Sequence, residues 1–499
     1  MAVQSLTTRR TTTVKVTFIL PDFRTTVAGY SGAFSHSVAY LSRYLKIAGH
    51  DADLLHVTRL PTKSEFQEQI VRRKPGLVGF SAIYHFFPLA EQWAGWSKEV
   101  SPAPVIFGGT YPTLDPETVI SAPSIDMLCR GEAEEALPEL CDALEQGREA
   151  SSVRNIWHKR DGRVCRTELR PLITDLNGLE FPDYSVHGYD DLFFTRTNTL
   201  SVMISRGCPY GCHYCSSRAL AGAYPEARRF YRFLSPERAT ELLVFLKKQY
   251  PRTERFVFND SILFPKKSWL ERFCVLYKKH VSLPFVGNCR PEGLDRDTAR
   301  MLAEMGCSIL CFGVESGNEH INSAVLGRRL TKERISRSFR TAHGAGIRTV
   351  AYSILGSPFE TRSTMLETVK FAAELEPHIA TPFIFYPFPG TEAHEMCRKS
   401  GFLTDRHFLN NDEGVMIEQP GITETDVLFF HAYYKRLVKA YIFLRRLPRP
   451  ARDWLAGGLD RALLSDRLPR AALVRFKAVL RRVRWRLLLL RTAHSPARS

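Results

Sequence analysis

Residues 200–215 read LSVMISRGCPYGCHYC and decide the fold of the chain's second half. The apolar run at 200–205 predicts a buried strand, and the loop after it carries Cys208, Cys212 and Cys215 within eight residues. Three thiolates from one glycine- and proline-containing loop can ligate a cubane iron–sulfur cluster, leaving one iron with an open site. The alternatives are buried cysteines or a structural zinc site, but zinc normally takes a fourth protein ligand, and His213 is awkwardly placed between two cysteines.

Downstream of this loop, apolar strands alternate with helices. We predict strands at 200–205, 255–258, 284–288, 308–315, 349–356 and 381–387. The helices between them are predicted at 236–249, 266–280, 295–305, 331–343 and 362–375. Ser235 before Pro236 is a favourable helix start. Six βα units predict a partial (β/α)6 TIM-type barrel over 196–420, with functional groups at the carboxyl ends of its strands.

The N-terminal part shows the same alternation on a smaller scale. Strands are predicted at 14–20, 51–57, 77–83, 103–109 and 125–129, and helices at 34–48, 64–73, 88–99 and 134–147. This pattern predicts an α/β, doubly wound, Rossmann-like parallel-sheet domain over 13–150, whose ligand lies over the carboxyl ends of the strands. A connector follows at 151–195, with a hairpin that turns at Asp161 and Gly162.

Composition excludes an integral membrane protein and a disulfide framework. The 499 residues are 44% hydrophobic and 24% charged, and no apolar run reaches the roughly 18 residues of a membrane span. The polar N-terminus and the short run at 14–20 do not resemble a signal peptide. Eleven cysteines in such a chain favour free thiols. We therefore expect a cytoplasmic enzyme.

The cysteine loop resembles the signature of the radical S-adenosylmethionine (SAM) enzymes: Cys-x3-Cys-x2-Cys after the first strand, with an aromatic residue before the last cysteine. This resemblance implies that Cys208, Cys212 and Cys215 ligate a 4Fe-4S cluster. The open iron would bind SAM, whose reductive cleavage yields a 5'-deoxyadenosyl radical. Tyr214 would lie against the adenine.

Further strand ends match positions of that family. The resemblance implies cofactor contacts for Asn259 and Asp260 after the second strand and for Glu315 and Ser316 after the fourth. It implies adenine contacts for Ile354 and Gly356 at the fifth strand. Asn259 departs from the pattern, because relatives often carry two acids there.

The N-terminal domain resembles the cobalamin-binding domain of one radical SAM subfamily, which Arg290 and 384–392 also resemble. GG-x-x-PT at 108–113 and GE-x-E at 131–134 match its recurring patterns, and glycines at a strand end let a flat ligand approach the backbone. The expected cobalamin-binding residues are Ser81, Tyr84, Gly108, Gly109, Pro112 and Thr113. The Asp-x-His-x-x-Gly motif that supplies a histidine to cobalt is absent, so cobalt would lack a protein histidine unless Tyr84 or His85 lies near it.

The resemblance implies a cobalamin-dependent methyltransferase acting on an unactivated carbon or a phosphorus of a small-molecule or lipid-like metabolite. A radical cyclase, ring-contracting or oxygen-inserting enzyme is the alternative. A tRNA methylthiotransferase would need a second N-terminal cysteine triad, and only Cys129 and Cys141 precede residue 150. A non-enzymatic electron carrier is disfavoured by the open iron. The cofactors carry the difficult chemistry, and a donor such as flavodoxin or ferredoxin would supply electrons.

The net charge of +17 is concentrated at the C-terminus, the basic helical region 421–499. Residues 435–499 contain 18 Lys and Arg against three acids, and helices are predicted at 435–447 and 470–491. Apolar residues between the basic ones suit an anionic membrane surface, and helices packed on the barrel with a solvated basic face are equally consistent. Nucleic-acid binding ranks third among the alternatives, because no recognised nucleic-acid-binding fold accompanies the charge.

Overall fold

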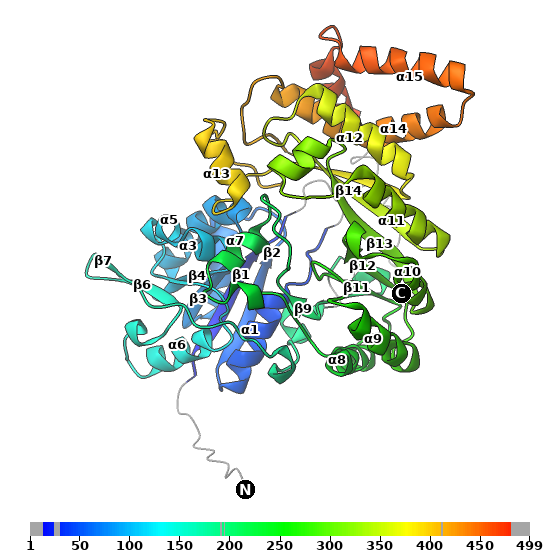
Figure 1. Ribbon diagram of the computed structural model, residues 1–499. Helices are drawn as coiled ribbons and strands as arrows, with labels where there is room; N and C mark the ends of the chain where they lie inside the picture. The colour runs from blue at the N-terminus through cyan, green and yellow to red at the C-terminus, as the bar shows by residue number, and fades with distance from the viewer. Residues whose placement is uncertain (1–12, 24–29, 190–191, 194, 411–412, 481–499) are drawn as a thin grey trace, which may run out of the picture. The chain divides into compact units, whose positions relative to one another are not determined.

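The structure is a computed structural model that describes residues 13–23, 30–189, 192–193, 195–410 and 413–480. Figure 1 shows the chain, which divides into two compact units. The first unit consists of Met1–Pro209 with Ala219–Thr253, and the second of Tyr210–Arg218 with Glu254–Ser499.

The first unit is built on a seven-stranded sheet of order β2-β1-β3-β4-β5-β6-β7. The strands are β1 (Lys15–Pro21), β2 (Asp51–Val57), β3 (Leu77–Ser81), β4 (Val105–Gly108), β5 (Met127–Cys129), β6 (Ile156–Arg160) and β7 (Arg163–Cys165). The helices between them are α1 (His36–Ile47), α2 (Lys63–Arg73), α3 (Phe87–Val100), α4 (Thr110–Leu114), α5 (Pro116–Ser121) and α6 (Ala136–Glu145). Strands β1 to β5 pair in parallel. The predicted parallel-sheet domain is confirmed.

Helices cover both faces of this sheet. On one face, Val38 of α1 and Leu137 of α6 join Phe18 and Ile106 of the strands in one buried cluster. On the other face, Phe107 of β4 contacts the α3 side chain Phe87 with ring centroids 5.9 Å apart. Because β1 has β2 on one side and β3 on the other, the strand order reverses at β1. Ligands of doubly wound folds bind at such a reversal.

The predicted hairpin extends the sheet. Strand β6 pairs antiparallel with β5 and with β7. Asp161 and Gly162 form the turn with φ of 51° and 72°, and two successive positive φ values are what a two-residue type I′ turn requires.

The rest of the first unit leads into and out of the cysteine loop. Its elements are β8 (Thr199–Val202), β9 (Ser205–Arg206), β10 (Arg232–Phe233) and α8 (Pro236–Gln249). Strands β9 and β10 pair antiparallel. As predicted, α8 begins at Pro236, where the Ser235 side chain accepts a hydrogen bond from the Arg238 amide. Helix α7 (Ser216–Gly222) follows the cysteines.

In the second unit, strands pair in parallel in chain order. They are β11 (Arg255–Phe258), β12 (Phe285–Cys289), β13 (Cys307–Glu315), β14 (Arg348–Leu355) and β15 (Ile379–Ile384). The intervening helices are α9 (Lys267–His280), α10 (Arg296–Glu304), α11 (Lys332–Gly344) and α12 (Arg362–Leu375). This is the βα alternation expected of a partial barrel.

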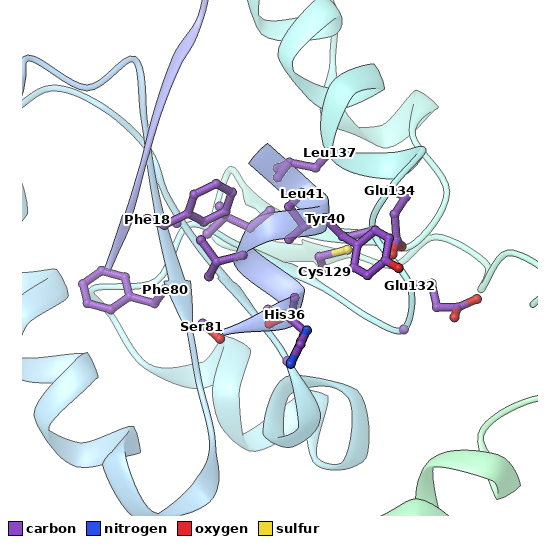
Figure 2. A pocket seen from close by; sticks show the side chains of 18 of the residues that line it. Phe18, His36, Tyr40, Leu41, Phe80, Ser81, Cys129, Glu132, Glu134 and Leu137 are labelled. Atoms are coloured by element: carbon purple, nitrogen blue, oxygen red, sulfur yellow. The ribbon is translucent and has the colours of Figure 1, made fainter. Parts of the chain in front are cut away.

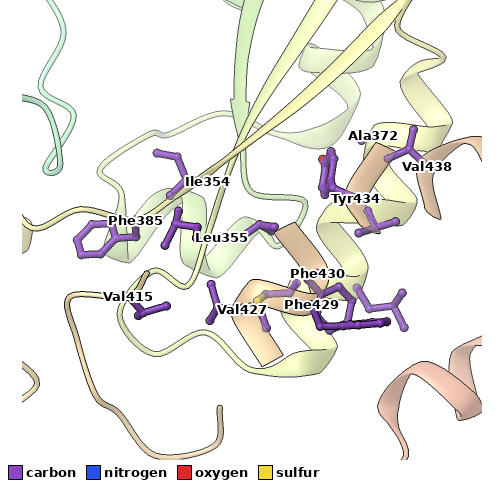
Figure 3. Packing of buried hydrophobic residues seen from close by; sticks show 14 of the residues in the cluster. Ile354, Leu355, Ala372, Phe385, Val415, Val427, Phe429, Phe430, Tyr434 and Val438 are labelled. Atoms are coloured by element: carbon purple, nitrogen blue, oxygen red, sulfur yellow. The ribbon is translucent and has the colours of Figure 1, made fainter. Parts of the chain in front are cut away.

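The basic C-terminal region contributes a helix to the core of the second unit. After α13 (Glu392–Lys399), the chain forms α14 (Glu424–Arg445) and α15 (Arg449–Leu464). Phe430, Tyr434 and Val438 of α14 are buried against Leu355 and Ala372, as Figure 3 shows. The Tyr434 hydroxyl lies 2.7 Å from Ser353 Oγ on β14. The predicted helix at 435–447 is therefore the second half of a core helix that begins earlier than expected.

The last predicted helix is only partly visible. It begins at Arg470 and is described as far as Leu480, and the remainder of the predicted 470–491 segment lies outside the described residues. Within the described part of the chain, no helix combines the length and the apolarity needed to cross a bilayer.

Candidate functional site

A cavity of about 480 Å³ opens at the carboxyl ends of the N-terminal strands. Figure 2 shows Phe18 and Phe80 from the sheet on one side and Tyr40 and Leu41 of α1 on the other. The remaining side of the cavity is formed by α6 and by the loop that precedes it. The cavity thus lies beside the β1/β3 reversal, where the fold predicts a ligand.

Three of the residues predicted to bind cobalamin line this cavity, namely Ser81, Gly108 and Gly109. Gly109 has φ of +113°, and a Cβ there would lie 2.8 Å from the Ala82 carbonyl oxygen, so no other residue fits without strain. A Cβ on Gly108 would meet no atom within 4 Å. The absent side chain therefore leaves open space that a ligand can use.

Tyr84, Pro112 and Thr113 are not among the lining residues. The Tyr84 ring packs edge-on against Tyr111, with centroids 4.9 Å apart. Thr113 Oγ1 donates to the Gly109 carbonyl at 2.8 Å and accepts from the Gly131 amide at 2.9 Å. Thr113 thus joins the two glycine-containing loops that the sequence patterns identified.

Several lining residues escaped the sequence prediction, among them His36, Tyr40, Cys129 and Arg206, and Glu132 and Glu134 line the cavity as well. His36 Nε2 lies 3.0 Å from Ser201 Oγ. Burial, with a smaller contribution from His187, lowers the pKa of His36 to about 3, so its ring is neutral at physiological pH. The GE-x-E pattern did signal Glu132 and Glu134, but nothing local indicated that α1 would supply a wall.

In the second unit, Arg290 organises the middle of the cysteine loop. Its Nη1 donates to Cys212 Sγ at 3.2 Å, and its guanidinium lies 3.8 Å from the centroid of the Tyr210 ring. Glu292 holds the arginine through Nε at 2.8 Å and Nη2 at 2.7 Å. Arg290 thus places a cationic hydrogen-bond donor against the buried Cys212 sulfur.

His213 is engaged elsewhere. Its Nδ1 lies 3.2 Å from the Val325 carbonyl oxygen and its Nε2 lies 2.9 Å from Glu392 Oε2. Both ring nitrogens therefore have partners outside the cysteine loop, which argues against His213 as the fourth ligand of a zinc site.

Tyr214 and Glu315, predicted on separate grounds, meet in the structure. The Tyr214 hydroxyl donates to Glu315 Oε1 at 2.9 Å, and Arg328 Nη1 lies 3.2 Å from the same oxygen. Arg328 is buried and was missed by the sequence prediction. Burial, followed by the Glu315 carboxylate, raises the pKa of Tyr214 well above its usual value. Glu315 also has a positive φ of 62°, an uncommon conformation outside glycine that often marks functional positions.

The other predicted residues end their strands as expected but differ in environment. Asn259 is exposed after β11, whereas Asp260 is buried and its carbonyl accepts from Asn288 Nδ2 at 2.9 Å. The side chain of Ser316 lies 3.3 Å from Thr368 Oγ1. Ile354, near the end of β14, belongs to the buried cluster of Figure 3. Gly356 follows the last residue of β14, and a Cβ added there would lie 2.9 Å from the Val427 side chain.

Comparisons with known proteins match both halves of the chain. The model of the radical SAM superfamily matches residues 202–372, and that of the B12 binding domain matches residues 30–141. An uncharacterised methyltransferase of Pyrococcus horikoshii is 28% identical over 390 residues, covering 77% of this chain and 83% of the relative. An anaerobic magnesium-protoporphyrin IX monomethyl ester cyclase of Rubrivivax gelatinosus is 28% identical over 391 residues, covering 75% and 68%.

Solved structures share the fold. The radical SAM methyltransferase TsrM from Kitasatospora setae, with cobalamin and a 4Fe-4S cluster bound, has a TM-score of 0.63 at 18% identity and 79% coverage of each chain. The cobalamin-dependent radical SAM enzyme OxsB has a TM-score of 0.69 at 14% identity, covering 96% of this chain and 80% of its own. With both domains in one chain, this protein belongs to the cobalamin-dependent radical SAM enzymes, whose cofactors are a 4Fe-4S cluster, SAM and cobalamin.

Proposed function

We propose that this enzyme transfers a methyl group from SAM to an unactivated carbon or a phosphorus of a small-molecule or lipid-like metabolite. The observation that carries the proposal is the pairing, in one chain, of an N-terminal cavity at a sheet reversal with a cysteine loop whose central sulfur accepts from Arg290. The bound cofactors supply radical formation and methyl transfer, and the protein supplies binding, orientation and exclusion of water.

Cys208, Cys212 and Cys215 are the proposed cluster ligands. Cysteine thiolates are the ligands that iron–sulfur clusters require, and the contact of Arg290 with Cys212 fits a sulfur that carries negative charge. Replacing any one of the three by alanine should abolish a cluster of about four irons. Iron and sulfide assays that remain unchanged in one variant would remove that residue as a ligand.

For SAM we propose contacts from Tyr214, Asn259, Asp260, Glu315, Ser316, Ile354 and Gly356. The meeting of Tyr214 and Glu315 supports this assignment most directly. Arg328 joins them as a positioning residue, because it fixes the Glu315 carboxylate and donates to the Gly313 carbonyl at 2.6 Å. The remaining residues are proposed because they lie at or directly after the carboxyl ends of their strands.

For cobalamin we propose the cavity lined by Ser81, Gly108 and Gly109, with Thr113 bracing its glycine loops. The open space beside Gly108 and the aromatic side chains of the cavity wall fit part of a corrinoid, either its flat macrocycle or its nucleotide tail. Neither Tyr84 nor His85 lines the cavity. His36 does line it, but its Nε2 lies 3.0 Å from Ser201 Oγ, and we propose that cobalt has no histidine ligand from the protein. Electron paramagnetic resonance of the cob(II)alamin form should then lack nitrogen splitting from a protein ligand. A nitrogen triplet with cobinamide, which has no base of its own, would contradict this.

Methyl transfer and the cyclase alternative predict different products from SAM. The reconstituted enzyme, supplied with hydroxocobalamin, SAM and a chemical reductant, should form both 5'-deoxyadenosine and S-adenosylhomocysteine. The second product appears only when the methyl group leaves SAM as a cation. Formation of 5'-deoxyadenosine without S-adenosylhomocysteine would favour a radical cyclase or ring-contracting enzyme. Relatives carry both kinds of name.

Two partners complete the proposal. A one-electron donor such as flavodoxin or ferredoxin would reduce the cluster. The α14/α15 region would contact an anionic membrane surface from the cytoplasmic side, because exposed Phe443 and Trp454 lie among basic residues. Nucleic acid is not proposed as a partner.

A further inference from the structure

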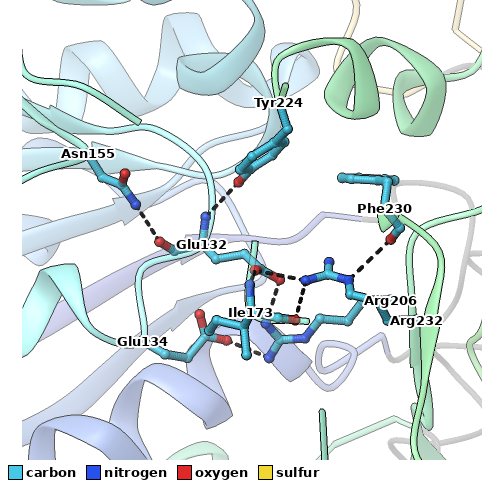
Figure 4. Close-up of polar contacts among 8 residues, drawn as sticks. All are labelled: Glu132, Glu134, Asn155, Ile173, Arg206, Tyr224, Phe230 and Arg232. Atoms are coloured by element: carbon cyan, nitrogen blue, oxygen red, sulfur yellow. Dashed lines mark hydrogen bonds and ion pairs between the residues drawn. The ribbon is translucent and has the colours of Figure 1, made fainter. Parts of the chain in front are cut away.

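A buried ion-pair network joins the wall of the N-terminal cavity to the strand that leads into Cys208. Figure 4 shows Arg206 between two carboxylates: its Nη1 donates to Glu132 Oε1 at 2.8 Å and its Nη2 to Glu134 Oε1 at 2.5 Å. Arg232, the partner of Arg206 in the β9–β10 pair, donates through Nη1 to Glu132 Oε2 at 3.0 Å. The two arginines of one short sheet thus share one glutamate.

The network is held from all sides. Glu132 receives hydrogen bonds on its side chain from the Ile173 amide at 2.9 Å and on its carbonyl from Asn155 Nδ2 at 2.7 Å. Its own amide donates to the Tyr224 hydroxyl at 3.1 Å. Because these three partners come from separate segments of the chain, Glu132 cannot shift without breaking several hydrogen bonds.

Burial makes these ion pairs strongly interdependent. The side chains of Arg206 and Glu132 are each 17% exposed, and that of Glu134 is 7% exposed. Charges removed from water interact strongly, and the loss of one partner leaves the other charge buried without compensation. The guanidinium of Arg206 also lies 4.9 Å from the centroid of the Tyr40 ring.

The same residues face the cavity and fix the chain before the first cysteine. Tyr40, Glu132, Glu134, Arg206 and Gly207 all line the cavity. Gly207 has φ of +80°, and a Cβ there would lie 2.2 Å from the Phe230 carbonyl oxygen. The backbone is therefore fixed on both sides immediately before Cys208.

We propose that Arg206 is a positioning residue that couples corrinoid binding in the cavity to cluster binding at Cys208. The inference rests on the proposed cofactor sites. A ligand in the cavity packs against the network and orders it, and a cluster on Cys208 orders the same strand from its other end. Each ligand then lowers the ordering cost of the other, and the coupling is reciprocal.

The test compares hydroxocobalamin affinity in two forms of the full-length protein, one with a reconstituted cluster and one stripped of iron by a chelator. In the unsubstituted enzyme the cluster should tighten corrinoid binding about tenfold, within the usual range of coupling between sites. Reciprocally, hydroxocobalamin should slow the loss of iron to the chelator. Equal affinities in the two forms would overturn the coupling while leaving corrinoid binding in place. Absence of corrinoid binding in both forms would instead overturn the cofactor assignment and the inference with it.

Substitutions within the ion-pair network test whether it carries the coupling between corrinoid binding and cluster binding. Arg206→Lys keeps the charge but cannot bond both glutamates with a planar fork, and Glu134→Gln removes one ion pair with little change of shape. Because both residues line the cavity, the affinity for hydroxocobalamin itself can change. The readout is the ratio of affinities between the two forms of each variant, which should fall from tenfold towards one. Arg228→Lys, at an exposed position in the same unit, is the control and should keep the ratio. Circular dichroism identifies any variant that does not fold, and a full ratio in folded Glu134→Gln and Arg206→Lys would exclude the network as the route.

Discussion

At the scale of single residues, Arg290 contacts two residues of the cysteine loop. It donates to Cys212 Sγ, stacks on Tyr210 and is anchored by Glu292. Only a planar guanidinium can make all three contacts at once, so lysine is not an equivalent replacement. Hydrogen bonds to ligand sulfurs tune iron–sulfur clusters, and Arg290 is placed to do so.

Arg290→Lys should therefore lower the rate of reductive SAM cleavage about 10- to 100-fold, the usual effect of losing an outer partner of a metal ligand. The rate is measured as 5'-deoxyadenosine formed by protein of known iron content. Arg296→Lys, at an exposed position at the start of α10, is the matched control and should retain the original rate. If Arg290→Lys cleaves SAM at the original rate, the contact with Cys212 does not affect this reaction.

Glu360 predicts a pH dependence of stability. Its side chain is 0% exposed. Burial raises its pKa from 4.5 to about 8, although the amides of Ser357 and Gly356 oppose the shift. Between these two pH values the folded state holds a proton that the unfolded state has released. The stabilisation of the folded state by the raised pKa of Glu360 is therefore complete below about pH 4.5, and it is lost as the pH rises towards 8.

Glu360→Gln should flatten this dependence, because glutamine stays neutral at every pH and can still accept from the Ser357 amide. For the unsubstituted protein, the free energy of unfolding should fall by on the order of 1 kcal/mol per pH unit between pH 6 and 8. Denaturant titrations followed by circular dichroism measure it. Glu333→Gln, exposed on α11, should keep the original slope, and an equal slope in Glu360→Gln would contradict the assignment.

At the scale of elements, α14 shows how a basic region can still be a core element. Its buried residues recur every three or four positions and face β14 and α12, as Figure 3 shows, whereas its opposite side is solvated. Deleting residues 435–499 would cut this helix and remove buried Val438 and Tyr441. Such a deletion tests the stability of the second unit and cannot isolate a membrane function.

Substitutions of two phenylalanines on α14 distinguish its buried side, which stabilises the second unit, from its exposed side. Phe430 is 0% exposed and Phe443 is 63% exposed. Phe430→Ala should lower the free energy of unfolding by about 3–5 kcal/mol, because it opens a cavity in the core. Phe443→Ala should change it by less than about 0.5 kcal/mol. Thermal or denaturant unfolding measures both, and similar effects of the two substitutions would contradict the burial of α14.

At the scale of the whole molecule, the positive charge and the exposed aromatic residues gather in the same C-terminal region. Phe443, Trp454 and Phe476 are 63%, 73% and 60% exposed. Exposed aromatic residues between arginines are typical of surfaces that lie on anionic lipid. Each basic residue near such a surface contributes about 1 kcal/mol, so a few suffice for reversible attachment.

Substitutions can test this attachment without truncation. Full-length protein should sediment with phosphatidylserine-containing liposomes at low salt and detach as salt rises, because screening shortens the reach of its charges. Arg446→Gln with Arg449→Gln should weaken binding. Arg334→Gln with Arg337→Gln on α11 lowers the net charge equally and should not. Loss of binding in both pairs would indicate a nonspecific charge effect, and no binding by the unsubstituted protein would end the membrane proposal.

The sequence determined much of this molecule by local signals alone. The Ser235-Pro236 start, the helix from Arg362 to Leu375 and the turn at Asp161 and Gly162 all lie where propensity and pattern placed them. Periodicity and capping are properties of neighbouring residues and can be read along the chain. The cysteine spacing likewise identified the family before any contact was known.

Only the tertiary structure decided which distant residues meet. Arg328 on Glu315, Arg290 on Cys212 and Arg206 between two glutamates are contacts whose partners are separated along the chain by 13, 78 and more than 70 residues. No local pattern encodes them, because an arginine on a strand or loop looks the same in sequence whether it is solvated or paired. Burial selects the paired state, since a charge removed from water requires an opposite charge or several hydrogen bonds. The sequence by itself therefore determined most of the strands and helices that alternate in the two units and the cofactor class. The folded chain decided the cavity wall, the buried ion pairs and the core position of α14.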